Sequence, residues 1–211
     1  LEQGLGAALQ GNLAQCDHAG STRQSVGLPP RDDSRVMNHD STQLPDALRA
    51  RLHKVSLWEF ALAFYSRDGV EAACLRLQDE AGVDVCELLW HAWLHHLGLA
   101  CDANPAAVRR WQREVTAPLR QLRRTLKPAA SARDSVAELR QTLKQAELQA
   151  EREALSRLAR LAHDSEQLRA LTPASPGLAE RLATCLQVQK KPQLSALHTL
   201  QSQLDPPSRP R

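Results

Sequence analysis

Apolar residues recur three and four positions apart along most of the chain, which is the spacing of one face of an α-helix. Four capping boxes mark helix starts, because Ser56, Asp68, Asp84 and Ser135 each precede a glutamate by three residues. Helix ends are marked by glycine or proline at Gly82, Gly98, Pro128 and Pro173. The pattern predicts an all-α fold with helices over residues 45–54, 57–66, 69–81, 85–97, 105–127, 135–171, 177–189 and 193–203.

The longest predicted helix, residues 135–171, carries one stripe of leucine and alanine. The stripe consists of Leu139, Leu143, Ala146, Ala150, Ala154, Leu158, Leu161 and Leu168. Because two shorter leucine-striped helices follow directly, we expect the long helix to form a hairpin with residues 177–203 of the same chain. A coiled-coil contact with a second chain is the alternative.

The aromatic residues all lie between Trp58 and Trp111, so this segment is expected to hold the core. Trp90 and Trp93 are predicted to be core anchors, and a pocket lined by tryptophan is the alternative. The expected organisation is an irregular extension over 1–43, a Trp-rich helical domain over 44–127, a Leu/Ala-rich helical hairpin over 128–204 and a disordered tail over 205–211. Because the pattern changes at Met37, we expect the natural start there.

Composition favours a cytoplasmic protein. Isoleucine is absent and β-branched and aromatic residues are scarce, which excludes a mainly β fold. No stretch reaches the ~20 apolar residues of a membrane span, so no membrane association is expected. The five cysteines are scattered and include no CxxC pair, which is typical of reduced thiols.

Charge is distributed unevenly. Residues 37–104 carry 5 basic and 10 acidic side chains, whereas residues 105–127 carry 7 basic and 1 acidic. At 100° per residue, the apolar residues of helix 105–127 share an arc of roughly 80°: Val108, Trp111, Val115, Leu119, Leu122 and Leu126. The arginines lie outside this arc, and Pro118 is expected to bend the helix or open one backbone bond.

The basic row is the predicted partner-binding face, with Arg109, Arg113, Arg120, Arg124 and Lys127 as its residues. A row of guanidinium groups suits carboxylate or phosphate partners, since each can donate two parallel hydrogen bonds. We therefore expect an acidic protein partner, with nucleic acid or the ribosome as the alternative and a merely solvated face as the simplest interpretation.

A weaker pattern involves Glu87, His91 and His95, which recur every four residues and share one helix face. Such a face can bind a metal through imidazole nitrogens, so a metal protein or an enzyme is the second alternative. However, no HExxH motif, phosphate-binding glycine loop or nucleophile motif is present. The sequence therefore predicts no cofactor and no catalytic residues.

Three tryptophan-bearing blocks resemble a small uncharacterised proteobacterial family, a helical domain of unknown function. They are Leu57–Leu62, Leu88–Leu94, and Trp111 with Pro118, Leu119 and Arg120. The resemblance extends from about Met37 to the middle of the long helix. It implies a helical cytoplasmic bacterial protein without implying an activity. Together with the charge pattern, it leads us to expect a non-enzymatic interaction, adaptor or regulatory protein.

Overall fold

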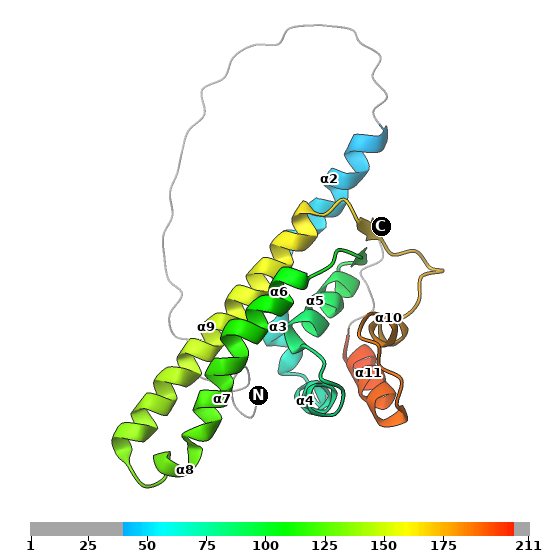
Figure 1. The fold of residues 1–211 in the computed structure, drawn as a ribbon. Coiled ribbons are helices and arrows are strands. Elements are labelled where there is room, and N and C mark those ends of the chain that lie inside the picture. The colour runs from blue at the N-terminus through cyan, green and yellow to red at the C-terminus, as the bar shows by residue number, and fades with distance from the viewer. Residues whose placement is uncertain (1–39, 205–211) are drawn as a thin grey trace, which may run out of the picture.

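The computed structural model describes residues 40–204, and the predicted all-α class is confirmed there (Figure 1). The first half contains α2 (Asp40–Leu52), α3 (Leu57–Tyr65), α4 (Val70–Ala81), α5 (Val85–His96) and β1 (Leu99–Cys101). The second half contains α6 (Ala106–Trp111), the π-helical turn η1 (Gln112–Thr116), α7 (Ala117–Thr125), α8 (Lys127–Ala130), α9 (Asp134–Asp164), β2 (Leu168–Ala170), α10 (Leu178–Cys185) and α11 (Lys191–Gln203).

The two chain ends lie mostly beyond the described part. The expectations for residues 1–39, including Met37, and for residues 205–211 fall outside it. The expected boundary at residue 43 is wrong, because α2 already begins at Asp40. The sequence at this start, Asp-Ser-Thr, consists of residue types that favour helix N-termini.

The predicted caps at Ser56 and Asp84 are confirmed, whereas those at Asp68 and Ser135 are wrong, because α9 already begins at Asp134 and α4 begins after Gly69. The Ser56 hydroxyl accepts a hydrogen bond from the Glu59 amide at 3.1 Å, and the Ser56 amide donates to the Glu59 carboxylate at 3.3 Å. Asp84 accepts from the Glu87 amide at 3.1 Å. The start of α4 differs, because Gly69 is its cap with a left-handed φ of 77° and no side-chain cap bond. A Cβ there would also lie 3.3 Å from Thr199 of α11. Glycine is therefore favoured both by the left-handed backbone and by the close approach of α11.

Helix α5 is the centre of the core. Every residue from Val85 to Leu94 is buried, and α3, α9 and α10 surround the helix. Trp90 and Trp93 are among the most completely buried side chains, which confirms them as core anchors. The Trp93 indole also donates a hydrogen bond of 3.0 Å to the Val55 carbonyl, which fixes the loop before α3 to α5.

The long helix is shorter than predicted. α9 ends at Asp164, and Ser165 is extended, with its hydroxyl accepting a hydrogen bond from the Gln167 amide at 2.9 Å. The residues that follow form β2, which pairs antiparallel with β1 and places Leu168 opposite Cys101. The apolar spacing that predicted a helix through Leu168 therefore serves a two-stranded ribbon.

The predicted hairpin between the long helix and residues 177–203 is wrong. α9 packs along α6, η1, α7 and α8 on one side and along α3 and α5 on another, whereas α10 packs on α5 and α11 on α4 (Figure 1). The β1–β2 ribbon directs the chain across the ends of the helices after α9. The leucine stripes of α10 and α11 are consequently buried on the far side of the core, through Leu178, Leu182, Leu197 and Leu200.

Candidate partner-binding surface

The predicted basic helix is one rod made of α6, η1 and α7, with a π-helical turn in its middle. A π turn holds one residue more than an α turn, so each later residue is shifted by one position around the axis. Pro118 lies directly after this turn and lacks the N–H that an α-helical ladder needs. Accordingly Thr116 and Arg123 are buried, each one position after a residue of the predicted stripe, while Leu122 of that stripe is 49% exposed.

The shift turns two arginines of α7, of which Arg123 is buried, toward two glutamates of α9. Arg120 donates to Glu147 and to Glu151 at 2.8 Å each, and Arg123 donates to Glu147 at 2.5 Å. Arg123, Glu147 and Glu151 are all at most 3% exposed. The expectation that the whole basic row faces outward is therefore wrong for Arg120 and Arg123.

The two glutamates of this ion-pair cluster differ electrostatically. Burial opposes ionisation of Glu147, but hydrogen bonds from Arg123 and Arg120 outweigh it and hold its pKa below the ordinary value. Glu151 receives a bond from Arg120 alone, and burial raises its pKa from 4.5 to about 7. Glu151 is therefore the weakly compensated acid of the cluster.

The raised pKa of Glu151 predicts that the contribution of this residue to the free energy of unfolding depends on pH. A carboxyl group with a raised folded pKa binds its proton more tightly in the folded state, so its contribution is intact below pH 4.5 and is lost as pH rises through about 7. The free energy of unfolding of Glu151→Gln minus that of the wild type should therefore increase between about pH 5 and pH 8, by an amount on the order of 2–3 kcal/mol. Urea unfolding at both pH values measures it, and a pH-independent difference would contradict it.

The other predicted basic residues fall into two groups, one ion-paired within the protein and one not. Arg109 donates to both carboxylate oxygens of Glu87, at 2.9 and 2.6 Å, and this pairing raises the pKa of Arg109. Arg113, Arg124 and Lys127 are exposed and form no ion pair with any part of residues 40–204. Only these three of the five predicted residues are available to an outside partner without competition from an internal carboxylate.

The distal part of this rod and its neighbour form an arm. α7 packs only on α9, apart from its junctions with η1 and α8, and α8 closes the end (Figure 1). The α7–α8–α9 end extends away from the body that contains α4, α5, α10 and α11. We refer to residues 117–147 as the arm.

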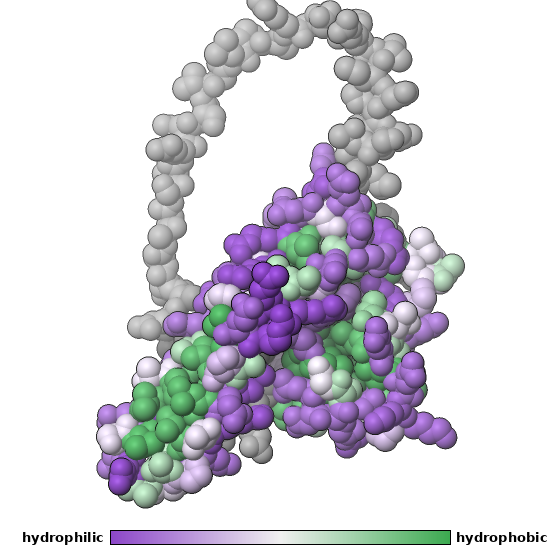
Figure 2. All heavy atoms as spheres, in the orientation of Figure 1, coloured by the Kyte–Doolittle hydropathy of each residue, from purple (hydrophilic) through white to green (hydrophobic). Residues whose placement is uncertain are grey.

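The arm exposes apolar side chains. Leu122 and Leu139 are 49% and 51% exposed, and they are the large apolar residues most open to solvent in the described range. Half-buried neighbours extend each row at helical spacing: Leu119 and Leu126 on α7, and Val136 and Leu143 on α9. Figure 2 shows an apolar area on the arm, bordered by hydrophilic residues. We refer to these six residues as the apolar strip.

The metal alternative receives no support from the geometry. Glu87 is occupied by Arg109, and Arg181 approaches His95 at 3.5 Å. Burial, with the positive charge of Arg181, lowers the pKa of His91 and of His95 to about 4. Between residues 40 and 204, no group of three or more His, Cys, Asp or Glu side chains is arranged to hold a metal ion.

Sequence reasoning missed Glu147 and Glu151, and it placed Arg123 on the wrong side. The two glutamates are four residues apart, so they share a face of α9, and they lie one position after Ala146 and Ala150 of the predicted stripe. This i, i+4 pair of acids opposite an arginine-rich helix was the available signal for an internal ion-pair cluster.

Comparison with known proteins gives one match. Residues 56–158 match a family described as "Protein of unknown function (DUF2390)". Neither the curated proteins nor the solved structures contain a match. The matched segment runs from the cap of α3 into α9 and contains all three tryptophan-bearing blocks, so the resemblance to an uncharacterised family is confirmed. Among the described helices, none has both the length and the apolar character required to cross a membrane.

Proposed function

We propose that the chain, whose residues 56–158 match this family of proteins of unknown function, is a non-enzymatic bacterial adaptor that works in the cytoplasm and binds another protein through its arm. The apolar strip carries this proposal, because two leucines about half exposed on a projecting element are an unfavourable surface unless something covers them. The five cysteines without a CxxC pair support the compartment.

The chemistry of the strip favours an amphipathic helix as the bound element. Apolar rows on two neighbouring helices form a continuous apolar face, against which a third helix can pack residues spaced three and four apart. Arg113 and Arg124 lie on the rod and Lys127 begins α8, and none of the three has a carboxylate partner within residues 40–204. A partner helix with acidic residues beside its apolar face would complement both features.

Replacing both exposed leucines should abolish this interaction. A photo-crosslinking residue at position 122 or at position 139 should capture one and the same protein in the native host. For that purified protein, Leu122→Asp with Leu139→Asp should weaken binding about 30-fold or more, since buried apolar anchors dominate such interfaces. Binding is measured by calorimetry after far-UV circular dichroism has shown unchanged helicity.

The matched controls are Gln121→Asp and Gln141→Asp, which are exposed on the same two helices but off the strip. These controls should retain wild-type affinity. Equal affinity of the leucine double variant and the wild type would contradict the proposal. Steep, salt-dependent binding of bulk RNA or DNA that is lost in Arg113→Glu with Arg124→Glu would instead favour the nucleic-acid alternative.

A further inference from the structure

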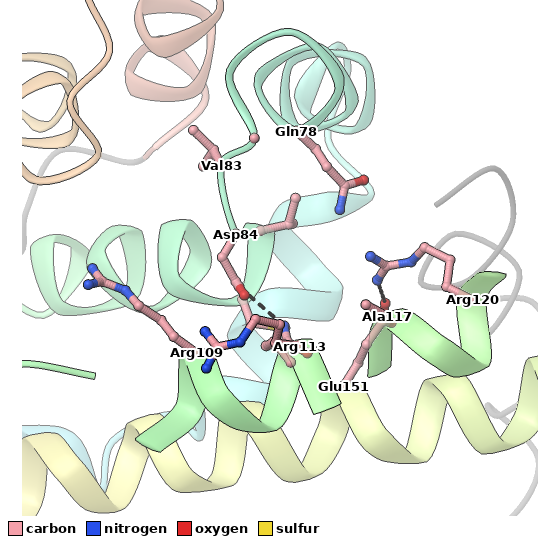
Figure 3. Close-up of a pocket in the computed structure, with 12 residues that line it drawn as sticks. Gln78, Val83, Asp84, Arg109, Arg113, Ala117, Arg120 and Glu151 are labelled. Atoms are coloured by element: carbon pink, nitrogen blue, oxygen red, sulfur yellow. Dashed lines mark hydrogen bonds and ion pairs between the residues drawn. The ribbon is translucent and has the colours of Figure 1, made fainter. Parts of the chain in front are cut away.

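A pocket of about 270 Å³ lies where the loop before α5 faces η1 and α7. Its polar lining comes from five helical elements and the loop before α5, and it consists of Gln78, Asp84, Arg109, Gln112, Arg113, Arg120 and Glu151. Figure 3 shows Asp84 and Glu151 entering from different elements, with Gln78 reaching from α4 toward the space between them. The volume is slightly below the range of drug-sized sites, so it suits a small metabolite.

The pocket contains buried acceptors that have no donor. Glu151 Oε2, Gln78 Oε1 and Gln112 Oε1 are all buried without a hydrogen-bond partner. Glu151 itself is 1% exposed, and its other oxygen accepts from Arg120 at 2.8 Å. Buried polar atoms are rarely left unpaired, since each costs roughly 1–3 kcal/mol. Three such acceptors lining one pocket therefore indicate a bound group rich in donors.

The neighbouring contacts decide which of these side chains are already committed. The Gln112 amide nitrogen donates to Asp84 at 3.2 Å, which leaves the Gln112 amide oxygen as the unfilled atom. Arg120 donates through Nε to Glu147 and through Nη2 to Glu151 Oε1, and it makes no hydrogen bond to Glu151 Oε2. Arg109 and Arg113 also line the pocket, and Arg109 is paired with Glu87. The buried pocket atoms that remain unfilled are acceptors, so they favour a ligand that donates hydrogen bonds.

We propose that this pocket binds a small molecule through a primary ammonium group, with Glu151 as the principal acceptor. An ammonium group offers three N–H donors and a positive charge, which matches a carboxylate beside two amide oxygens. Burial raises the pKa of both Asp84 and Glu151, because desolvation of each acid outweighs the hydrogen bonds that it accepts. A bound cation would add a positive charge beside these two carboxyl groups.

Two kinds of compound carry this group: free amino acids, whose carboxylate would face the exposed Arg113, and simple amines without a carboxylate. The test is a thermal-shift screen of the purified protein with the proteinogenic amino acids, their decarboxylated amines and the N-acetyl derivative of each. At least one ammonium compound should raise the melting temperature, and its N-acetyl derivative should not. Binding of the amino acid but not of its amine would assign the carboxylate to Arg113.

The variants locate the bound group. For the best compound, Glu151→Gln should lower the affinity measured by calorimetry by about tenfold or more, because it removes a charge-assisted hydrogen bond. Glu153→Gln is the matched control, since Glu153 lies on the same helix and pairs with Arg157 at 2.7 Å outside the pocket. Gln78→Leu gives a second variant, which should lose affinity without losing stability.

Three results would overturn the proposal: no compound binds, the N-acetyl derivatives bind equally well, or both pocket variants bind like the wild type. The site is independent of the apolar strip, so the Leu122 and Leu139 variants should retain the ligand. Failure of the ligand screen and failure of the adaptor proposal are therefore distinguishable.

Discussion

Arg123→Met should lower the free energy of unfolding by about 3–5 kcal/mol, which is the typical cost of removing one member of a buried ion pair. Methionine approximates the aliphatic stem of arginine, so the variant tests the charge more than the packing. Glu147 would lose its 2.5 Å bond and remain buried with Arg120 as its single partner. Urea unfolding followed by circular dichroism measures the loss.

Two comparisons isolate the charge. Arg124→Met, one residue along the same helix and exposed, should change stability by less than about 0.5 kcal/mol. Adding Glu147→Gln to Arg123→Met should recover part of the loss, because the uncompensated carboxylate is removed with its partner. A cost below about 1 kcal/mol for Arg123→Met would mean that the cluster behaves like a surface ion pair.

Trp93→Ala should also cost about 3–5 kcal/mol, through the cavity that it leaves at the centre of the core. Trp93 is 1% exposed and lies on α5, which other helices surround. The change also removes the indole donor of the Val55 carbonyl, so the loop before α3 loses its attachment to α5. The same urea titration measures the loss, and a thermal scan should show a correspondingly lower midpoint.

Trp58→Ala removes the same side chain from a less buried position and so serves as the comparison. Trp58 is half-buried, and the Arg152 guanidinium lies 5.2 Å from its ring centre. Trp58→Ala should cost clearly less than Trp93→Ala, since part of the Trp58 ring is already in water. Near-wild-type stability of Trp93→Ala, combined with a loss of partner binding, would identify Trp93 as a site residue and contradict its role as a core anchor.

Features fixed by local chemistry were predictable from the sequence. The caps at Ser56 and Asp84 depend on residues three positions apart, and the burial of Trp90 and Trp93 follows from their size and apolar surroundings. In each case the interaction that decides the structure lies within a few residues, or needs no particular partner.

The π turn was not predictable from periodicity. The apolar residues of the rod obey ideal α-helical spacing, yet the backbone holds one additional residue between Gln112 and Thr116. The gain that offsets this turn is non-local, because the shift brings Arg120 and Arg123 to Glu147. Pro118 indicates that the backbone hydrogen bonds of the helix are interrupted, but it does not indicate which way the later side chains are shifted around the axis. An error of one residue was therefore enough to bury Arg123 and to expose Leu122.

The predictions of where α9 ends and of which helices pack against it failed for a similar reason. Leucine spacing identifies a helix face but does not name what covers it. The ribbon that redirects the chain depends on Leu99 and Ala100 pairing with residues about seventy positions later. Two three-residue strands carry too little pattern to be recognised before their pairing is known.

The position of α10 and α11 has a consequence for synthesis. The family-matched segment ends at residue 158, but the faces of α4 and α5 are covered by helices that begin at Leu178 and Lys191. A ribosome translates all of the matched segment before it makes this cover, so the face of α4 that packs on α11 stays uncovered in the nascent chain until α11 emerges. The family-matched segment and the segment that completes this core are therefore different lengths of chain, and the longer one sets the earliest moment at which the core can close.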